Sequence, residues 1–449
     1  MNVTRRTAGL ALVVGLCLVS LGAMRVVAQD TAKPATGDPC AGAGQKYTVA
    51  EYNAYTAAAN EKSPPVQLKA LDDFVGKYPQ SCLLNYIYPL YYQNYAGQKN
   101  FPKVMDYADK ELGLGEKISP TERYTAYQAI VYAFNNTSNP DAATAKRAYT
   151  AAVEGAKSVA ALPKPDTMDE AAWADAKKKA VLAFVSTQAS AAMAAKDFPA
   201  AVQAYKTVLA STPDDFVANY YLGRAYSAMT PPQQLDALWA FARAATVKTA
   251  NEKQSKQVKD YLRSTALPRY QGGTVCDALT DAELNELLQL ASSSVDRPAS
   301  YKLASADDLK AARDNMTIAS VFTDLKAGGD KAKLTWTAAC GLEFPDVPGK
   351  LIGITPGPDV IALNLAFVTS EAEFDAKNTA DMDVKIKTTD QPDAAKLEKD
   401  SAPRFTGTLE SYDPDPAFML HWDKAKVNPD DLPKEGKKPA GKKPVAKKP

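Results

Sequence analysis

The chain has one histidine, His421, and this is where catalytic chemistry would be expected first. Histidine is the usual general acid or base near neutral pH, and many serine or cysteine nucleophiles depend on one. His421 stands beside Trp422 in a segment that predicts a strand, and no G-x-S-x-G motif, phosphate-binding loop or dinucleotide-binding glycine motif accompanies it. We therefore predict a structural histidine, no cofactor and no enzymatic activity.

Carboxylates leave one catalytic alternative open. The chain has 52 aspartate and glutamate residues, and two that meet only in the folded protein can act as the acid and base of a hydrolase. No spacing in the sequence identifies such a pair. A hydrolytic enzyme with an unrecognised carboxylate site therefore stays an alternative hypothesis.

The cysteines predict disulfides rather than a metal or redox site. The sequence has no C-x-x-C motif and no cluster of cysteine and histidine, so zinc, haem attachment and thioredoxin-type chemistry lack their usual ligands. Cys17 falls in a segment that we expect to be removed. The other four cysteines allow three pairings, and we predict Cys40 with Cys82 and Cys276 with Cys340, because each pair then falls within one half of the chain.

The N-terminus predicts export. Arg5 and Arg6 precede an apolar run from residue 8 to residue 23, and Val26 and Ala28 stand at the spacing that precedes a cleavage site. These are the parts of a signal peptide, which we place at residues 1–28. The run is short for a permanent span of about 20 residues, so a retained membrane anchor is the alternative. We predict a periplasmic or secreted protein of the bacterial envelope, where disulfides form.

Charge is distributed unevenly. The formal net charge is +1, but the segment from Lys424 onward has nine lysines and three acidic residues, so residues 1–423 carry a net charge of about −5. An acidic body lacks the basic stripe of a nucleic-acid-binding protein, and we expect no nucleic acid partner. Residues 429–449 are rich in Lys and Pro and are predicted to be a disordered tail. This tail can adhere to an anionic envelope polymer or lipid, or it can simply aid solubility.

Composition also divides the chain into regions. Ala, Tyr and Leu at helical spacing prevail up to about residue 268, whereas Gly, Pro and alternating apolar residues prevail later. Ser305 is a favoured N-cap and predicts one or two helices over residues 305–325. We predict a flexible segment at 29–47, a helical repeat domain at 48–268, a helical linker region at 269–345 and a small β domain at 346–428, followed by the tail.

The helical part repeats one kind of turn. Asn100-Phe101-Pro102 and Asp197-Phe198-Pro199 each combine a side chain that can cap a helix with a proline where a missing N–H costs nothing. Further helices are predicted at 66–79, as a pair within 83–112 and as a pair within 119–157. Five tyrosines in the first pair could line a ligand cleft, but their helical spacing favours packing within a hairpin: Tyr86, Tyr88, Tyr91, Tyr92 and Tyr95.

The segment 182–215 resembles a tetratricopeptide repeat (TPR), a helical hairpin that stacks on its neighbours. A second unit begins at residue 219 and carries the family's Leu-Gly pair at Leu222 and Gly223. The resemblance implies an irregular α-solenoid of helical hairpins. In the first unit Asp197-Phe198 matches the family's inter-helix turn, and Ala201 matches its small residue at the helix contact. Tyr205 matches its aromatic residue and Pro213 its terminal proline.

In TPR proteins the first helix of each hairpin lines a concave surface that holds a peptide or a partner helix. The resemblance implies that five residues point there: Ser186, Ser190 and Met193 in one unit, and Tyr220 and Arg224 in the next. An arginine can bind a carboxylate through two parallel hydrogen bonds, and a tyrosine offers rigid contact area. The alternatives are a surface salt bridge for Arg224 and a core contact for Tyr220.

The end of the chain predicts strands. Five short segments, several with alternating apolar residues, lie at 351–354, 360–368, 382–388, 405–412 and 418–427. The last two are similar to the closing hairpin of small OB-like barrels, which implies a barrel face that can bind an oligonucleotide or oligosaccharide. We nevertheless interpret four aromatic residues of this hairpin as core or edge residues: Phe405, Tyr412, Phe418 and Trp422.

The sequence thus predicts a multidomain protein with a TPR-like α-solenoid and a small C-terminal β-barrel or sheet. Its expected function is an exported envelope scaffold or adaptor that binds another exported protein or peptide. One alternative is a structural envelope-associated protein held by its basic tail, which predicts adhesion that is sensitive to salt and lost with residues 434–449. The other is the hydrolytic enzyme, which predicts a pair of carboxylates with shifted pKa values.

Overall fold

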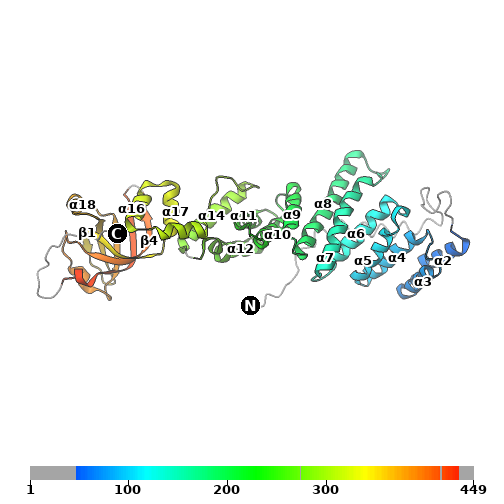
Figure 1. The fold of residues 1–449 in the computed structure, drawn as a ribbon, viewed down its shortest axis with the longest axis horizontal. Helices are drawn as coiled ribbons and strands as arrows, with labels where there is room; N and C mark the ends of the chain where they lie inside the picture. Colours follow the sequence, from blue (N-terminus) through cyan, green and yellow to red (C-terminus); the bar gives the residue numbers. More distant parts are fainter. Residues whose placement is uncertain (1–46, 274, 415–416, 434–449) are drawn as a thin grey trace. The chain divides into compact units, whose positions relative to one another are not determined.

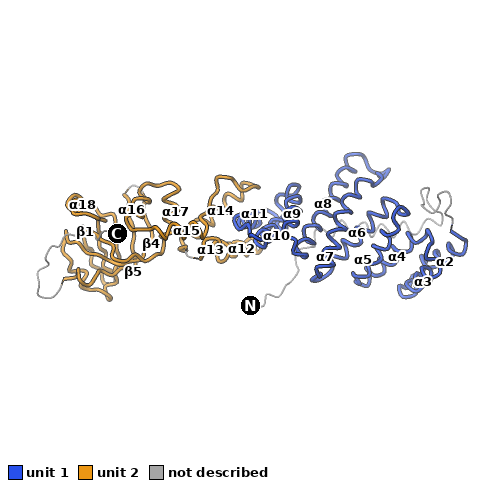
Figure 2. Tube along the Cα trace, in the orientation of Figure 1, with its two compact units in different colours: residues 1–252 blue, residues 253–449 orange. Residues whose placement is uncertain are grey.

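The chain divides into two units, each with its own core. A computed structural model describes residues 47–273, 275–414 and 417–433 (Figure 1). Unit 1 comprises residues 1–252 and unit 2 residues 253–449 (Figure 2). The predicted signal peptide, Cys40 and the chain from residue 434 onward lie outside the described residues. Within the described ranges, no helix is both long enough and apolar enough to cross a membrane.

The described part of unit 1 consists of helices joined by short turns, as the sequence predicts (Figure 1). In chain order these are α2 (Val49–Asn60), α3 (Pro64–Lys77), α4 (Leu84–Gly97), α5 (Phe101–Leu112), α6 (Pro120–Asn136), α7 (Ala142–Ser158), α8 (Glu170–Ala194), α9 (Phe198–Ser211), α10 (Phe216–Ala228) and α11 (Gln234–Thr246). Two 3₁₀ turns, η2 (Gly115–Lys117) and η3 (Val159–Ala161), follow α5 and α7.

The two predicted turns before α5 and α9 have the same construction. Asn100 accepts a hydrogen bond from the backbone N–H of Lys103, and Asp197 accepts one from Ala200, so both side chains cap their helices as predicted. A proline occupies the first turn of each helix. The residues before the caps, Lys99 and Lys196, have φ angles of 57° and 62°. The repeated sequence therefore gives a repeated backbone conformation.

Helices of unit 1 pack in the order in which they occur. Each helix contacts the next one along the chain, and the first helices of successive hairpins also touch, α2 with α4, α4 with α6 and α6 with α8. Shared apolar clusters bury these contacts, as where Val104 of α5, Ile130 of α6 and Ala148 of α7 meet. Packing between sequence neighbours is the pattern of a helical solenoid.

Glycines lie directly against aromatic rings where two pairs of helices pack. A Cβ atom on Gly155 of α7 would lie 2.3 Å from the ring of Phe184 on α8. A Cβ atom on Gly223 of α10 would lie 2.9 Å from the ring of Phe241 on α11. In both places a large aromatic side chain fills the space beside a residue that has no side chain.

Unit 2 starts with further helices. These are α12 (Glu252–Tyr261), the π-helical turn η4 (Leu262–Ala266), α13 (Leu267–Gln271), α14 (Asp277–Ser293), α15 (Ala306–Asp314), α16 (Ile318–Ala327) and α17 (Gly329–Ala339). Ser305 caps α15 by accepting a hydrogen bond from the N–H of Asp308, and Thr317 caps α16. Residues 305–325 therefore hold two helices, one of the two predicted outcomes.

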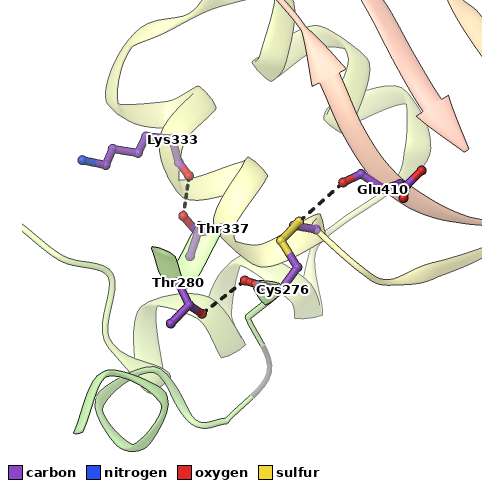
Figure 3. The surroundings of a disulfide bond; sticks show 6 residues. Cys276, Thr280, Lys333, Thr337 and Glu410 are labelled. Carbon is purple, nitrogen blue, oxygen red and sulfur yellow. Dashed lines mark hydrogen bonds between the residues drawn. A yellow bond between two sulfur atoms is a disulfide. The ribbon is translucent and has the colours of Figure 1, made fainter. Parts of the chain in front are cut away.

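A disulfide between Cys276 and Cys340 joins the start of α14 to the end of α17 (Figure 3). This confirms one predicted pairing. The Sγ atom of Cys340 lies 4.0 Å from the carbonyl oxygen of Glu410, on a strand of the barrel (Figure 3). The bond therefore links the helices of unit 2 close to the barrel. Cys82 is also disulfide-bonded, and its predicted partner Cys40 lies outside the described residues.

Five strands close the barrel of unit 2 in the order β1-β2-β3-β5-β4. They are β1 (Glu343–Thr355), β2 (Val360–Phe367), β3 (Met382–Lys387), β4 (Arg404–Asp413) and β5 (Met419–Val427). The β3 and β5 strands pair in parallel, and the other pairs are antiparallel. Helix α18 (Glu371–Ala376) and the 3₁₀ turn η5 (Pro392–Lys396) lie between strands, and η6 (Pro429–Asp431) follows the last one.

Aromatic side chains fill the barrel. Trp422 is fully buried and meets the rings of Phe344 and Phe405 edge-on, with centroids 5.7 and 5.3 Å away. Tyr412 and Phe418 are partly buried against the same core. The interpretation of the four aromatic residues of the last hairpin as core or edge residues is therefore confirmed.

The ends of the barrel differ from the prediction. Strand β1 begins at Glu343, well before the predicted residue 351, and a bulge between Phe344 and Val347 accommodates an unpaired stretch. Prolines in this segment argue against a strand when only the sequence is read. At the other end, Arg404 forms an ion pair with Asp431 at 3.0 Å, and Leu432 packs against the core. The folded chain therefore extends beyond residue 428.

Candidate binding surface on the helical unit

The predicted residues of α8 share one face of the helix. Ser186, Ser190 and Met193 are half-buried and follow the helical spacing of one face. The opposite face carries Phe184 and Ala191, which are buried in the core. Each serine hydroxyl donates a hydrogen bond to a carbonyl of its own helix, over 2.9 Å from Ser186 and 3.1 Å from Ser190. Their oxygen lone pairs can still accept hydrogen bonds from a bound chain.

Arg224 lies on the exposed face of α10. Val217, which is 40% exposed, and Tyr221 share this face. The guanidinium carbon of Arg224 lies 5.4 Å from the centroid of the Tyr221 ring, within the range of a cation–π interaction. Among the described residues no carboxylate forms an ion pair with Arg224, whereas the buried Arg243 pairs with Asp214 at 2.8 Å. The salt-bridge alternative for Arg224 is therefore not formed in this structure.

Tyr220 packs within the hairpin. Its ring stacks on Phe216, with centroids 6.0 Å apart, and meets Phe241 of α11 at 5.7 Å. This is the core contact that was the alternative for Tyr220, although part of the ring stays exposed. The residue that lies under Arg224 is Tyr221, which the sequence reasoning did not select. The available signal was its position three residues before Arg224, where side chains of a helix meet.

An aromatic layer extends from Tyr221 to α9. The Tyr221 ring stacks on the ring of Tyr205, with centroids 6.2 Å apart and an angle of 13° between the planes. Burial raises the pKa of Tyr205, the neighbouring Tyr221 raises it further, and the positive charge of Arg224 lowers it. The positive charge of Arg224 therefore acts through this aromatic layer as far as the buried Tyr205.

The tyrosines of α4 pack inside the solenoid. Tyr91 is buried, stacks on Tyr107 of α5 with centroids 3.9 Å apart, and donates a hydrogen bond of 2.6 Å to Asp72 of α3. Tyr95 stacks on the same Tyr107 ring at 5.6 Å, and Tyr86 contacts Tyr55 of α2 at 5.9 Å. The interpretation of this cluster as hairpin packing is confirmed for Tyr91 and Tyr95, whereas Tyr86 packs against the preceding hairpin.

Glu111 of α5 is a carboxyl group whose pKa is strongly shifted. Burial raises its pKa to about 8, the nearby hydroxyl of Tyr92 lowers it, and the negative charge of Glu122 raises it. The side chain is 0% exposed, between α4, α5 and α6. A substrate could reach this carboxyl only by separating the helices, so its position is that of a buried structural group.

His421 lies on the outside of the barrel between two aspartates. Its Nδ1 atom is 3.2 Å from Asp383 on the neighbouring strand β3, and its Nε2 atom is 2.9 Å from Asp413 on β4. Burial lowers the pKa of His421, but hydrogen bonds and charge attraction from Asp413 and Asp383 outweigh this effect and raise the pKa above 6.5. Both ring nitrogens have partners, as expected for the structural histidine of the prediction.

Comparisons with known proteins give no relative. No protein-family model, curated protein or solved structure matches the chain. In the described part of the chain, no group of three or more histidine, cysteine, aspartate or glutamate side chains could hold a metal ion.

Proposed function

We propose that the protein is an exported scaffold or adaptor, and that unit 1 binds another exported protein or peptide through the exposed faces of α8 and α10. The observation that carries this proposal is the environment of Arg224. This arginine is exposed, it rests on Tyr221, and the described chain supplies no carboxylate to pair with it. Such a group is suited to a carboxylate from a second molecule.

The arrangement of the helices supports a TPR-like assignment. The α8–α9 hairpin has its turn at Asp197, and in the α10–α11 hairpin the Phe241 ring packs over Gly223, both at positions that the family resemblance implies. Both α8 and α10 are the first helices of their hairpins, which in such solenoids line the binding surface. Ser186, Ser190 and Arg224 are then ligand-facing residues.

The chemistry of this surface favours a polypeptide that carries an acidic group. Ser186 and Ser190 offer hydrogen-bond acceptors to backbone N–H groups, and Met193 offers adaptable apolar contact. Arg224 adds a positive charge on α10, the first helix of the next hairpin. We therefore propose an extended segment or a helix of an exported protein whose carboxylate binds Arg224.

The disulfide is compatible with an oxidising, exported location, because such bonds persist mainly outside the cytosol. We propose that the barrel, whose strand order fits the small OB-like barrels that its sequence resembles, has a structural role. Support comes from Phe405 and Trp422, which fill its core and are not available as a platform for bases or sugars.

Affinity capture from an envelope extract tests this proposal. The mature protein would be compared with Arg224→Ala, with Lys146→Ala as the control on the second helix α7, and with a chain that ends at residue 433. One reproducible protein that is lost with Arg224→Ala and retained with Lys146→Ala supports the adaptor. Recovery of wall or lipid material alone, lost with the tail, would replace it with the structural alternative.

A further inference from the structure

Three helices of unit 1 enclose a group of polar side chains with buried atoms that lack hydrogen-bond partners. Glu111 of α5 and Asn85 of α4 are 0% exposed, and Tyr92 of α4 is 3% exposed. Neither carboxyl oxygen of Glu111, nor the Oδ1 atom of Asn85, nor the hydroxyl of Tyr92 makes a hydrogen bond. Tyr92 influences Glu111 through its proximity, without the geometry of a formed bond. Unpaired buried polar atoms are rare, so four of them on neighbouring helices require an explanation.

Glu122 of α6 completes the cluster and is already paired. Its Oε1 atom accepts a hydrogen bond of 2.9 Å from the Nδ2 of Asn85, and its Oε2 atom accepts one of 2.6 Å from the N–H of Ser119. The nearby Arg123 donates instead to the carbonyl of Gly115 at 2.6 Å. The titratable groups that act on Glu111 are therefore Tyr92 and Glu122, and neither is positively charged.

The cluster has too many acceptors. Asn85 Oδ1 and the two oxygens of an ionised Glu111 need donors, whereas only the Tyr92 hydroxyl is available to give a proton. An ionised Glu111 would also add a second negative charge beside Glu122 in a space that excludes water. One proton on Glu111 removes both problems, because the carboxyl group becomes a donor and loses its charge.

We propose that Glu111 is the proton-binding residue of a pH-dependent lock, in which its protonated form holds α4, α5 and α6 together and loss of the proton weakens their packing. The lock is independent of the proposed binding function. It works through the packing of the first hairpins, where α4 and α6 contact each other directly.

The direction of the pH effect follows from the two pKa values of Glu111. Burial raises its pKa from 4.5 to about 8 in the folded protein, and opening of the helices returns it to the ordinary value. Between these values the closed state holds one proton more than the open state. The equilibrium constant for opening then rises about tenfold per pH unit over this window and levels off on either side.

Hydrogen exchange read by mass spectrometry on the full mature chain tests the lock. Opening of α4, α5 and α6 would be measured from pH 5 to pH 9, after correction for intrinsic exchange, with α10 and α11 as internal reference. In wild type and in the exposed control Glu116→Gln, the equilibrium constant for opening should rise by as much as about tenfold per pH unit. Glu111→Gln, which keeps a donor but does not titrate, should show no such slope.

A slope in Glu111→Gln equal to that of wild type would overturn the proposal. Tyr92→Phe provides a second readout if Glu111→Gln does not fold. Because Tyr92 lowers the pKa of Glu111, its removal should extend the slope to higher pH. An unchanged upper limit in Tyr92→Phe would likewise refute the lock.

Discussion

The guanidinium group of Arg224 lies over the ring of Tyr221, one turn earlier on α10, at 5.4 Å from the ring centroid. Tyr221 in turn stacks on Tyr205 of α9, so the support under the arginine spans two helices. Arg224 is thereby held in a defined place without using its hydrogen-bond donors on a carboxylate of the described chain. Pre-organisation of this kind lowers the entropy lost when a partner binds.

The support beneath Arg224 can be tested separately from its charge. Tyr221→Leu should weaken partner binding about twofold to fivefold, because an exposed cation–π contact contributes roughly 0.5–1 kcal/mol. Tyr221→Phe keeps the ring and should bind like wild type. A titration of the captured partner against each variant measures this. Equal affinity for the Leu and Phe variants would show that the ring does not position Arg224.

The close helix contacts predict opposite effects of two Gly→Ala substitutions. Gly155→Ala should destabilise unit 1 by about 1–3 kcal/mol, because its Cβ would lie 2.3 Å from the Phe184 ring and the core would have to shift. Gly76→Ala on α3 has no neighbour within 4 Å and should stabilise by up to about 1 kcal/mol. Urea unfolding of both variants measures the difference. A change in the free energy of unfolding with the same sign in both variants would contradict this account of the packing.

The sequence predicted those helices and strands whose ends are set by residues close to them in the chain. Asn100 and Asp197 cap helices through bonds to residues three positions later, so their role was visible in the sequence. Strands β2 to β5 were found within a residue or two because their apolar residues alternate. Strand β1 was largely missed, since its pairing with β4 overrides the prolines at its start.

Features that depend on distant partners were not visible in the sequence. The burial of Glu111 beside Asn85, Tyr92 and Glu122 requires three helices to be placed around it. The distinction between Tyr220 and Tyr221 also depends on neighbours, Phe241 on one side and Tyr205 on the other. Helical periodicity assigns a residue to a face but does not say which helix covers that face.

The disulfide of unit 2 should contribute measurably to stability. Cys276 and Cys340 are 64 residues apart, and closing a loop of this length stabilises a fold by about 4 kcal/mol in the chain-entropy account. In a background with Trp173→Phe and Trp239→Phe, the double variant Cys276→Ser with Cys340→Ser should therefore unfold at lower urea, followed by the fluorescence of Trp336 and Trp422. Cys82→Ser is the control and should leave this transition unchanged. An unchanged transition in the double variant would refute the prediction.

His421 predicts that the barrel loses stability as the pH rises. Its pKa is raised above 6.5 by Asp413 and Asp383, so the charged imidazolium favours the folded state. This contribution is fully present below pH 6.5 and disappears as the pH passes the raised pKa of the folded protein. We expect a loss of roughly 1 kcal/mol, because the side chains are partly exposed.

NMR titration measures this directly, since His421 is the one histidine of the chain and its imidazole resonances need no assignment by mutation. Asp413→Asn should lower the measured pKa and remove part of the pH dependence of barrel unfolding. A measured pKa at or below 6.5 in wild type would contradict the described pair of hydrogen bonds.

Site-specific photo-crosslinking in the intact envelope tests the central claim most directly. A photoreactive amino acid would replace Ser190 on α8 or Val217 on α10, with Lys146 on α7 as the matched position on a second helix. The adaptor account predicts one and the same crosslinked protein from Ser190 and Val217, its loss when Arg224→Ala is added, and no such product from Lys146. Crosslinks of equal yield from all three positions, or none from the first two, would contradict it.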